Sequence, residues 1–583
     1  MVSKQARTKV LVLDGDMPHS VAIVRSLGRL GVQVDVASYQ AAPIAGYSRH
    51  ACLVLQYPDP LSKENDFVST INQWQLTHNY DLIIPVTERS MVALHKHRSS
   101  LAEIGRIAMP DQNSLEVALD KQKTFQLAES LNIPVPAGTV MEQGDPVDNV
   151  PTTITFPAVL KPGRSVAAGD GTAKQISVDY ALDATEFTPK ARDLCQHGSL
   201  IVQEYFRGEG VGIEVLAAQG DIVYAFQHKR LHELPLTGGG STLRESVDID
   251  PVLLDASARL LKSLQWHGVA MVEFKREPAT GEYRLMEING RFWGSLPLAI
   301  AAGADFPRLL LALYQDALAS AALPPYQRGV VCRRLDNDLL WTETVLRGAD
   351  TRGLVEAPHK KDALWTLASM FGRNQYFDVQ SFADIKPGLV DLGRIVGNYA
   401  ARLTSLLTEK FDRFTHGRAG KRKQLAKGLQ SAKSILFVCY GNINRSALAE
   451  YVFLAKGGGG DCSVASAGFH QVAGRPADAQ MVEVSRLKGI DLGPSASSIL
   501  DRDMLQSADV VLVMEVIHIK QIAQEYPDQA HKVFLLGLMK QQTGASNCEI
   551  ADPYGKVSGV YENCFNEISD SVGSIISIRE ARL

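Results

Sequence analysis

Three features are scarce in this sequence: cysteine, net charge and long apolar runs. Seven cysteines are spread without regular spacing over 583 residues, which argues against a disulfide framework and favours a reducing compartment. The formal net charge is −4, so composition gives no case for nucleic acid as a partner. No apolar run reaches the roughly 18 residues of a membrane-spanning helix, and the N-terminus leads into a strand pattern instead of a signal segment. We therefore expect a cytoplasmic protein without a membrane span.

Length and patterning predict several α/β units. A chain of 583 residues should hold about three to four folding units. Apolar runs at 10–13 and 32–37 flank a helical pattern at 20–30, and another strand pattern follows at 81–85. This strand–helix–strand order is typical of a parallel α/β domain. Because Gly15 after the first strand is not part of a GxGxxG pattern, we expect no dinucleotide site there.

The most informative stretch is SILFVCYGNINRSALAE at 434–450. An apolar strand leads to Cys439, a tight turn contains Gly441, and a helix is expected to begin at Arg445 and Ser446. Backbone amides and the dipole of a helix N-terminus stabilise an anion and favour a nucleophilic thiolate. A guanidinium can also hold two phosphoryl oxygens at once. The pattern predicts phosphate-ester hydrolysis at Cys439; the alternative is a buried cysteine between a strand and an ordinary helix.

From about residue 434 to 583 the sequence resembles the low-molecular-weight protein tyrosine phosphatases. The resemblance rests on CYGNINRS at 439–446, SAG at 466–468 with GRPAD at 474–478, GIDL at 489–492 and ADPYG at 551–555. It implies that Cys439 is the nucleophile, Arg445 the phosphate clamp and Ser446 the hydroxyl that steadies the leaving thiolate, with Asp552 as the acid for the leaving group. Chemistry agrees, because an alkoxide or phenoxide leaves poorly unless it is protonated. The resemblance further implies a domain without cofactor and a phosphate cradle built from the backbone amides of Tyr440, Gly441, Asn442, Ile443 and Asn444.

One departure from this family concerns oxidation. Asn444 stands where the family often has a second cysteine, which can form a reversible disulfide with the nucleophile. The remaining cysteines of this region are Cys462, Cys548 and Cys564. We therefore expect Cys439 to be oxidised irreversibly more easily, and the missing thiols also argue against the arsenate reductases that share the fold.

The aromatic slot for a phosphotyrosine ring is less defined in the sequence. Tyr440 and Tyr554 are candidates to line it, whereas His470 stands where a more apolar group is expected. The substrate therefore stays open between protein phosphotyrosine and another phosphomonoester.

Two lysines in the N-terminal half have the setting of phosphate ligands. Lys121 follows Asp120 at the predicted start of a helix, and a predicted strand places Lys161 just before a glycine-bearing loop. Glycine lets backbone amides approach phosphate closely, and lysine adds a point charge. For Lys161 alone, a plain turn is the alternative interpretation.

A predicted hairpin at 269–292 groups two acids and an amide. Its turn is expected near 279–281, and period-two alternation places Glu287 and Asn289 on one face, with Glu273 on the adjoining strand. Neighbouring buried carboxylates are tolerated when a cation lies between them, and oxygen ligands suit Mg²⁺ bridging nucleotide phosphates. The alternative is a pair of surface acids.

These pieces together resemble the ATP-grasp superfamily, specifically the carbamoyl-phosphate-synthase-like carboxylate ligases. The resemblance covers about residues 8–325, with an end near 405 as the alternative, and its most specific segment is MVEFK…LMEINGRFWGS at 271–295. It implies phosphorylation of a small-molecule carboxylate by ATP, followed by attack of an amine or other nucleophile. The implied roles are ATP binding by Lys121, Lys161, Gly169 and Gly171, an adenine hinge at Glu204, Mg²⁺ (or Mn²⁺) binding by Glu273, Glu287 and Asn289, and contact of Arg291 with the acyl phosphate or γ-phosphate.

The acceptor site is predicted in HKRLHELPLTGGGSTLRES at 228–246. Its glycines and basic residues could orient an anionic substrate, although a solvated loop would have the same composition. The candidate residues are Arg230, Gly239, Ser241 and Arg244.

The predicted fold class is thus α/β with α+β: an ATP-grasp fold, a helical extension and a phosphatase domain with a central parallel sheet. The expected boundaries are 1–118 for an α/β domain, 119–325 for the ATP-grasp domain, 326–408 for the extension, 409–433 for a basic linker and 434–583 for the phosphatase. The linker is predicted from its excess of lysine and arginine without strong apolar periodicity. The alternative is a basic patch that meets an acidic partner, RNA or an anionic membrane surface.

Three functional hypotheses follow. In the first, the ligase and the phosphatase are two active enzymes of one pathway. In the second, the phosphatase is a regulator of phosphotyrosine proteins. In the third, one half is a binding or scaffold module. The complete sets of candidate catalytic residues in both halves argue against the third. The oligomeric state, the natural substrates and the coupling between the sites are left open by the sequence.

Overall fold

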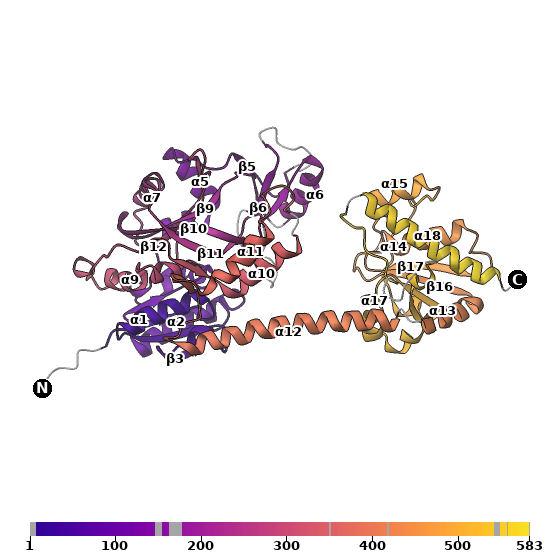
Figure 1. Cartoon of the computed structure of the whole chain (residues 1–583), viewed down its shortest axis with the longest axis horizontal. Coiled ribbons are helices and arrows are strands. Elements are labelled where there is room, and N and C mark those ends of the chain that lie inside the picture. The colour runs from indigo at the N-terminus through magenta and orange to yellow at the C-terminus, as the bar shows by residue number, and fades with distance from the viewer. Residues whose placement is uncertain are drawn as a thin grey trace. The chain divides into compact units, whose positions relative to one another are not determined.

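The computed structural model describes residues 7–145, 154–162, 178–196, 198–348, 351–416, 419–540, 548–556 and 558–581. The chain divides into two compact units, Met1–Val396 and Gly397–Leu583 (Figure 1). Among the helices of the described residues, none combines the length and the apolar character that crossing a membrane requires.

The first unit begins with a parallel α/β domain. Its four strands lie in the order β3-β2-β1-β4, all parallel, as the alternation of strand and helix predicts. The strands are β1 (Lys9–Val12), β2 (Gln33–Ser38), β3 (Ala51–Gln56) and β4 (Leu82–Ile84), and the helices are α1 (Pro18–Arg29), α2 (Glu64–His78), α3 (Glu88–Lys96) and α4 (Gln112–Leu119).

A small antiparallel sheet follows, in the order β5-β8-β6-β7. Its elements are α5 (Lys121–Ser130), β5 (Gly138–Met141), β6 (Ala158–Pro162), β7 (Asp179–Ala181), α6 (Ala184–Cys195) and β8 (Leu200–Glu204). The Asp120 carboxylate accepts hydrogen bonds from the amides of Gln122 and Lys123, which fixes the start of α5 as predicted.

The large sheet of the first unit has seven strands in the order β13-β12-β9-β10-β11-β14-β15. The strands are β9 (Glu209–Ala218), β10 (Asp221–Leu234), β11 (Gly240–Val247), β12 (Gly268–Arg276), β13 (Tyr283–Asn289), β14 (Val331–Arg333) and β15 (Gln375–Phe377). The associated helices are α7 (Pro251–Ser263), α8 (Leu296–Ala301), α9 (Phe306–Tyr314), α10 (Leu335–Arg347) and α11 (Lys360–Ala368). β12 and β13 form the predicted hairpin, and their register places Glu273 directly opposite Glu287.

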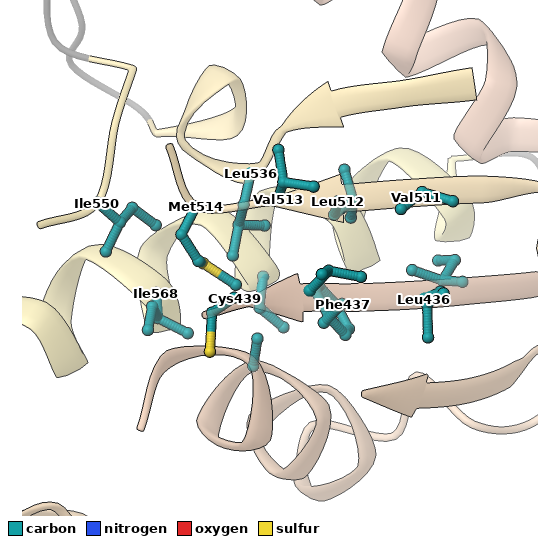
Figure 2. Packing of buried hydrophobic residues seen from close by; sticks show 14 of the residues in the cluster. Leu436, Phe437, Cys439, Val511, Leu512, Val513, Met514, Leu536, Ile550 and Ile568 are labelled. Atoms are coloured by element: carbon teal, nitrogen blue, oxygen red, sulfur yellow. The ribbon is translucent and has the colours of Figure 1, made fainter. Parts of the chain in front are cut away.

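The second unit is built on a parallel sheet in the order β17-β16-β18-β19. Its strands are β16 (Ser434–Cys439), β17 (Ser463–Gly468), β18 (Val510–Val513) and β19 (Val533–Leu535), and its helices include α14 (Arg445–Ala455), α15 (Ala479–Leu487), α16 (Arg502–Ser507), α17 (Val516–Glu525) and α18 (Ser558–Glu580). β16 and β18 are continuous apolar runs because helices cover both faces of the sheet. Figure 2 shows Leu436, Phe437 and Cys439 lying beside Val511 to Met514 in this core.

Two expectations about the connecting region are corrected by the structure. The extension at 326–408 is not purely helical, because β14 and β15 within it complete the large sheet next to β11. The segment at 409–433 is not an exposed linker: it contains the end of α12 (Ile385–His416) and all of α13 (Ala419–Ser431). Leu425 and Leu429 of α13 are fully buried in the phosphatase core, so apolar packing outweighs the basic composition.

Candidate active sites

A cavity of about 260 Å³ in the first unit gathers many of the predicted ligase residues. Its lining comes from both antiparallel regions, the small sheet with α5 and the large sheet. Of the residues expected to act in the ligase, it brings together Lys121, Lys161, Glu204, Arg230, Gly239, Glu273 and Glu287. A cavity with converging cations and acids among apolar residues, at a junction of sheets, has the composition of a nucleotide and substrate site.

The two acids occupy this cavity from adjacent strands. Burial raises the pKa of Glu273, although the Arg230 guanidinium beside it acts in the opposite direction. Burial also favours the neutral form of Glu287, but Lys121 and the Asn289 amide outweigh it and lower the pKa of Glu287. Asn289 donates its Nδ2–H to Glu287 Oε1 at 2.9 Å, which leaves the amide oxygen of Asn289 as a ligand atom.

The cations of the cavity are held close to these acids. Arg230 Nη2 lies 2.5 Å from Glu273 Oε2, and its Nη1 lies 3.0 Å from Glu233 Oε1. Burial and the neighbouring charge of Lys121 lower the pKa of Lys161 to about 8. An approaching anion would favour the charged form of Lys161.

Several expected ligase residues do not line this cavity. Arg291 donates from Nη2 to Glu88 Oε1 at 3.0 Å, which ties the end of the hairpin to the start of α3. Arg244 is 1% exposed, and its Nη2 lies 2.5 Å from Asp378 Oδ1, so a substrate would reach it only by displacing that partner. The hydroxyl of Ser241 donates to Leu243 O at 3.4 Å. Gly169 and Gly171 lie outside the described residues.

Sequence reasoning missed Gln203 and Lys275 in the cavity lining. Gln203 is 3% exposed, and its Oε1 has no hydrogen-bond partner, which is rare for a buried amide. Gln203 immediately precedes Glu204 at the end of an apolar strand, and that position is the signal that could have drawn attention to it. Lys275 follows Glu273 by two residues, so period-two alternation already places it on the same face.

In the second unit, Cys439 lies at the carboxyl end of β16 in a network of polar contacts. Its Sγ is 3.0 Å from Ser446 Oγ and accepts the amide hydrogen of Asn442 at 3.2 Å. The Asn442 side chain donates to Ser446 Oγ and to Ser466 Oγ, each at 2.9 Å. Ser466 in turn donates to Glu450 at 2.6 Å. The predicted nucleophile and its predicted hydroxyl partner are therefore adjacent.

The loop from Tyr440 to Asn444 is turned so that its carbonyl oxygens bond to groups outside it. Tyr440 O accepts from His470 N at 3.0 Å, Gly441 O from Arg475 Nη2 at 2.5 Å, and Ile443 O from Asp478 N at 2.9 Å. In a trans peptide the N–H points opposite to the preceding carbonyl, so the next amides face the thiol side. The amide of Asn442 is an instance, since it bonds to Cys439 Sγ.

Asn442 and Gly468 shape the loop. Asn442 has a φ of +52°, a left-handed conformation that asparagine tolerates better than most residues. A Cβ on Gly468 would lie 2.7 Å from Tyr440 O and 2.9 Å from Asn442 N, so only glycine allows β17 this close to the loop.

Arg445 is almost fully buried and joins two acids. Its Nη2 lies 2.6 Å from Asp552 Oδ2, and its Nη1 donates to Glu515 Oε2 at 2.6 Å. Burial alone would lower the pKa of Arg445, but Cys439, Asp552 and Glu515 raise it. Cys439, Arg445, Ser446 and Asp552 thus share one site, in which the guanidinium bonds to the acid and interacts electrostatically with the thiol.

Glu515 and His518 are residues of this site that sequence reasoning missed. Glu515 caps α17, and His518 Nδ1 accepts the Glu515 amide hydrogen at 3.2 Å. Burial and the charge of Arg445 lower the pKa of His518 to about 3, so this ring is neutral. The position of Glu515, two residues after the end of the buried strand β18 that neighbours β16, is the available signal.

The rim of the phosphatase site is exposed and aromatic. Tyr440 is 56% exposed and Tyr554 64% exposed, and the ring of His470 lies edge-on to Tyr440 at 6.1 Å. Asn444 is buried, and its Oδ1 has no partner. All seven cysteines are free thiols.

Comparison with known proteins places both regions. The family model of low molecular weight phosphotyrosine protein phosphatase matches residues 434–581, and a model described as ATP-grasp in the biosynthetic pathway with Ter operon matches residues 196–337. The probable low molecular weight protein-tyrosine-phosphatase EpsP of Ralstonia nicotianae is 36% identical over 140 residues, which cover 24% of this chain and 91% of EpsP. The protein-arginine-phosphatase of Bacillus subtilis is 33% identical over 138 residues, covering 23% and 89%.

The C-terminal region therefore belongs to the low molecular weight protein tyrosine phosphatase family, and it is joined to an N-terminal ATP-grasp module. Both are families of enzymes, so the chain combines a ligase-like module with a phosphatase domain. Among solved structures, the L-amino acid ligase of Bacillus licheniformis is similar over 55% of this chain and 78% of its own, with 14% identity and a TM-score of 0.43. The predicted fold class and the predicted fusion are confirmed by these family matches.

Proposed function

We propose that this chain is a bifunctional enzyme: an ATP- and Mg²⁺-dependent carboxylate ligase joined to a cysteine-dependent phosphomonoester phosphatase of phosphotyrosine type. The observation that carries the phosphatase proposal is the grouping of Cys439, Arg445 and Asp552. The observation that carries the ligase proposal is the cavity in which Lys121 and Lys161 meet the paired acids Glu273 and Glu287.

In the phosphatase proposal, the thiolate of Cys439 attacks phosphorus while the ester P–O bond breaks. Asp552 gives its proton to the leaving oxygen, and the phosphoryl group is then covalently bound to sulfur. Water attacks the phosphocysteine, Asp552 accepts the proton, and the S–P bond breaks to release phosphate. Arg445 binds the equatorial oxygens in place of its present carboxylate partners, and the Ser446 hydroxyl, 3.0 Å from Sγ, stabilises the departing thiolate.

The proposal for an aryl phosphate rests on the rim. Tyr440 and Tyr554 present more than half of their surface to solvent, although aromatic residues are usually buried. Exposed rings next to a phosphate cradle suit a flat substrate ring, with edge-to-face or offset stacking.

In the ligase proposal, Lys121 and Lys161 bind ATP phosphates, and the segment at Glu204 meets the adenine. The substrate carboxylate attacks the γ-phosphorus and ADP leaves; an amine then attacks the acyl carbon and phosphate leaves. Arg230 and Gly239 line the same cavity and are the proposed acceptor-side contacts, whereas Arg244 and Ser241 are left out because of their buried or local bonding. Arg291 is proposed to meet the acyl phosphate after release from Glu88.

The residues present fit a Mg²⁺ ion. Within the described ranges, no group of three or more His, Cys, Asp and Glu could hold a metal alone. Two carboxylates directly opposite each other and the Asn289 amide oxygen form a partial oxygen set, which suits an ion that also takes phosphate and water ligands. When bound, the ion would neutralise charge on the phosphates. Its binding would require Arg230 to release the carboxylate of Glu273.

The test uses the full chain and the variants Cys439→Ser and Glu287→Gln, with a panel of carboxylates, amines and phosphoesters. We expect carboxylate-dependent ADP release that is lost only in Glu287→Gln, and hydrolysis of a phosphotyrosine peptide that is lost only in Cys439→Ser. Phosphoarginine and phosphorylated sugars in the panel test other phosphoesters.

Each result has a defined meaning. Phosphoester cleavage without any carboxylate-dependent ADP would favour the alternative function, a phosphatase whose ATP-grasp half is a nucleotide-binding or scaffold module. Faster cleavage of phosphoarginine or sugar phosphate than of phosphotyrosine would overturn the proposed substrate class.

A further inference from the structure

The helix α12, which is labelled in Figure 1, carries an exposed apolar seam, as the exposed fractions of its side chains show. Seven residues follow one another at spacings of alternately four and three, and each is between 38% and 66% exposed. They are Ile385, Leu389, Leu392, Val396, Tyr399, Leu403 and Leu406, called here the α12 seam.

Alternating spacings of four and three have an average of 3.5 residues. This is the repeat of a coiled coil, in which side chains of one helix fit between those of a second helix with the same repeat. The α12 seam spans just over three such repeats, the length at which the pattern becomes informative. A helix that covers a globular core normally has a wider apolar face.

The N-terminal part of α12 is fixed so that the seam is turned outward. Asp391 accepts a hydrogen bond from Gln380 at 2.7 Å, and Arg394 donates to Ala42 O at 2.9 Å. Next to Arg394, Ile395 is only 7% exposed. These residues of α12 bond or pack within the first unit, whereas the seam residues beside them are exposed.

The flanks of the seam favour a partner with the same surface. Beside its centre lie Gly393, Gly397 and Ala400, and a Cβ on either glycine would have no atom within 4 Å. Small, uncharged flanks let two backbones approach and bring no like charges together when a residue meets its own copy. The two glycines also lower the intrinsic helix propensity, so a long exposed helix gains from packing its apolar face.

We propose that the α12 seam binds the α12 seam of a second copy of this chain, giving a coiled-coil homodimer. A membrane surface is the less favoured occupant, because interfacial helices have broad apolar faces bordered by rows of lysine and arginine. The α12 seam is narrow and lacks such rows between Leu389 and Tyr399, although Leu407, Phe411 and Phe414 widen the exposed apolar face toward the end of the helix.

The experiment is sedimentation equilibrium of the full chain, with a chain mass of 63.5 kDa. The seam variant combines Leu389→Lys, Val396→Lys and Leu403→Lys. The matched control combines Asn398→Lys, Ala401→Lys and Ser405→Lys, which add the same charge to exposed positions of the same helix off the seam.

We expect wild type and control to sediment at twice the chain mass at micromolar concentration, and the seam variant at the chain mass. The dissociation constant should rise by about a hundredfold or more in the seam variant, because lysine at buried seam positions opposes association. Unchanged helix content and phosphatase activity show that the variants fold.

Three results would overturn the proposal. The first is wild type sedimenting at the chain mass at all concentrations, which means that the seam is covered within one chain or left bare. The second is a dimer that persists in the seam variant. The third is a monomeric wild type that co-floats with vesicles of phosphatidylglycerol and phosphatidylcholine while the seam variant does not.

Discussion

Asn444 places a carboxamide instead of a thiol in the phosphate loop, at a buried position next to Arg445. A sulfenic acid that finds no partner thiol proceeds to the irreversible sulfinic acid. After brief hydrogen peroxide treatment, we expect dithiothreitol to restore only a minor part of wild-type phosphatase activity and most of the activity of Asn444→Cys. Asn444→Ser is the matched control and should behave as wild type. Full recovery of wild type would mean that another thiol, such as Cys564, protects the site.

Lys161 predicts a pH dependence for the ligase. Its pKa of about 8 means that the free enzyme loses this charge above pH 8, whereas bound phosphates restore the proton. The apparent KM for ATP should therefore be flat below about pH 8 and rise above it, by at most about tenfold per pH unit for one proton. Lys161→Arg should remove the dependence, and phosphatase activity of the same samples is the internal control. A KM that stays flat up to pH 9.5 would contradict this assignment.

The same group affects folding stability with the opposite trend. Because the pKa of Lys161 is lower in the folded protein than its ordinary value of 10.5, the unfolded chain binds more protons between about pH 8 and 10.5. The contribution of Lys161 to stability therefore rises with pH across this window. We expect ATP affinity to fall in that pH range while the contribution of Lys161 to folding stability rises, so the two effects differ in their pH trend.

At the scale of elements, α13 is part of the phosphatase domain. Leu429 is fully buried in its core, so Leu429→Ala should lower the free energy of unfolding by about 2–5 kcal/mol. Gln424→Ala, an exposed site on the same helix, should change it by less than about 0.5 kcal/mol. The measurement is the urea midpoint for loss of phosphatase activity, because a chain of two units need not unfold in one step. Equal midpoints for both variants would contradict this assignment and indicate that α13 is a linker.

The success of sequence reasoning differed between elements for physical reasons. The β12–β13 hairpin was predictable because period-two alternation assigns Glu273 and Glu287 to one face of the sheet and their apolar neighbours to the other. The short strands β14 and β15 have three residues each, which is too few for a periodic signal. In α13, only Leu425 and Leu429 provide apolar anchors among basic residues, and the sequence does not reveal which core receives them.

Single residues of the sites were likewise predictable only where a local motif contains them. Cys439, Arg445 and Asp552 belong to motifs and were brought together as expected. Glu515 belongs to no motif that we recognised, and its contact with Arg445 depends on the packing of β18 beside β16. Arg244 has the residue type of an anion ligand, but its ion pair with Asp378 is a long-range contact that local sequence cannot indicate.

At the scale of the whole molecule, the two sites should work independently. Each unit has its own buried core, and separate cores make separate function the default. Cys439→Ser should leave ADP release within about twofold of wild type, and Glu287→Gln should leave phosphatase kinetics equally unchanged, since each substitution alters only its own cavity. Assays of both activities on both variants check this. A change of tenfold or more in the distant activity would demonstrate coupling between the sites.

β14 and β15 lie at the end of the large sheet, and their position determines where the ligase module ends as an independent folding unit. A polypeptide ending near residue 325 would leave β11 as a bare edge, with unpaired backbone groups that invite association with other chains. It would also remove Asp378 and leave the buried charge of Arg244 without this partner. The smallest self-sufficient ligase therefore extends at least to Val379, whose side chain closes the core beside β14.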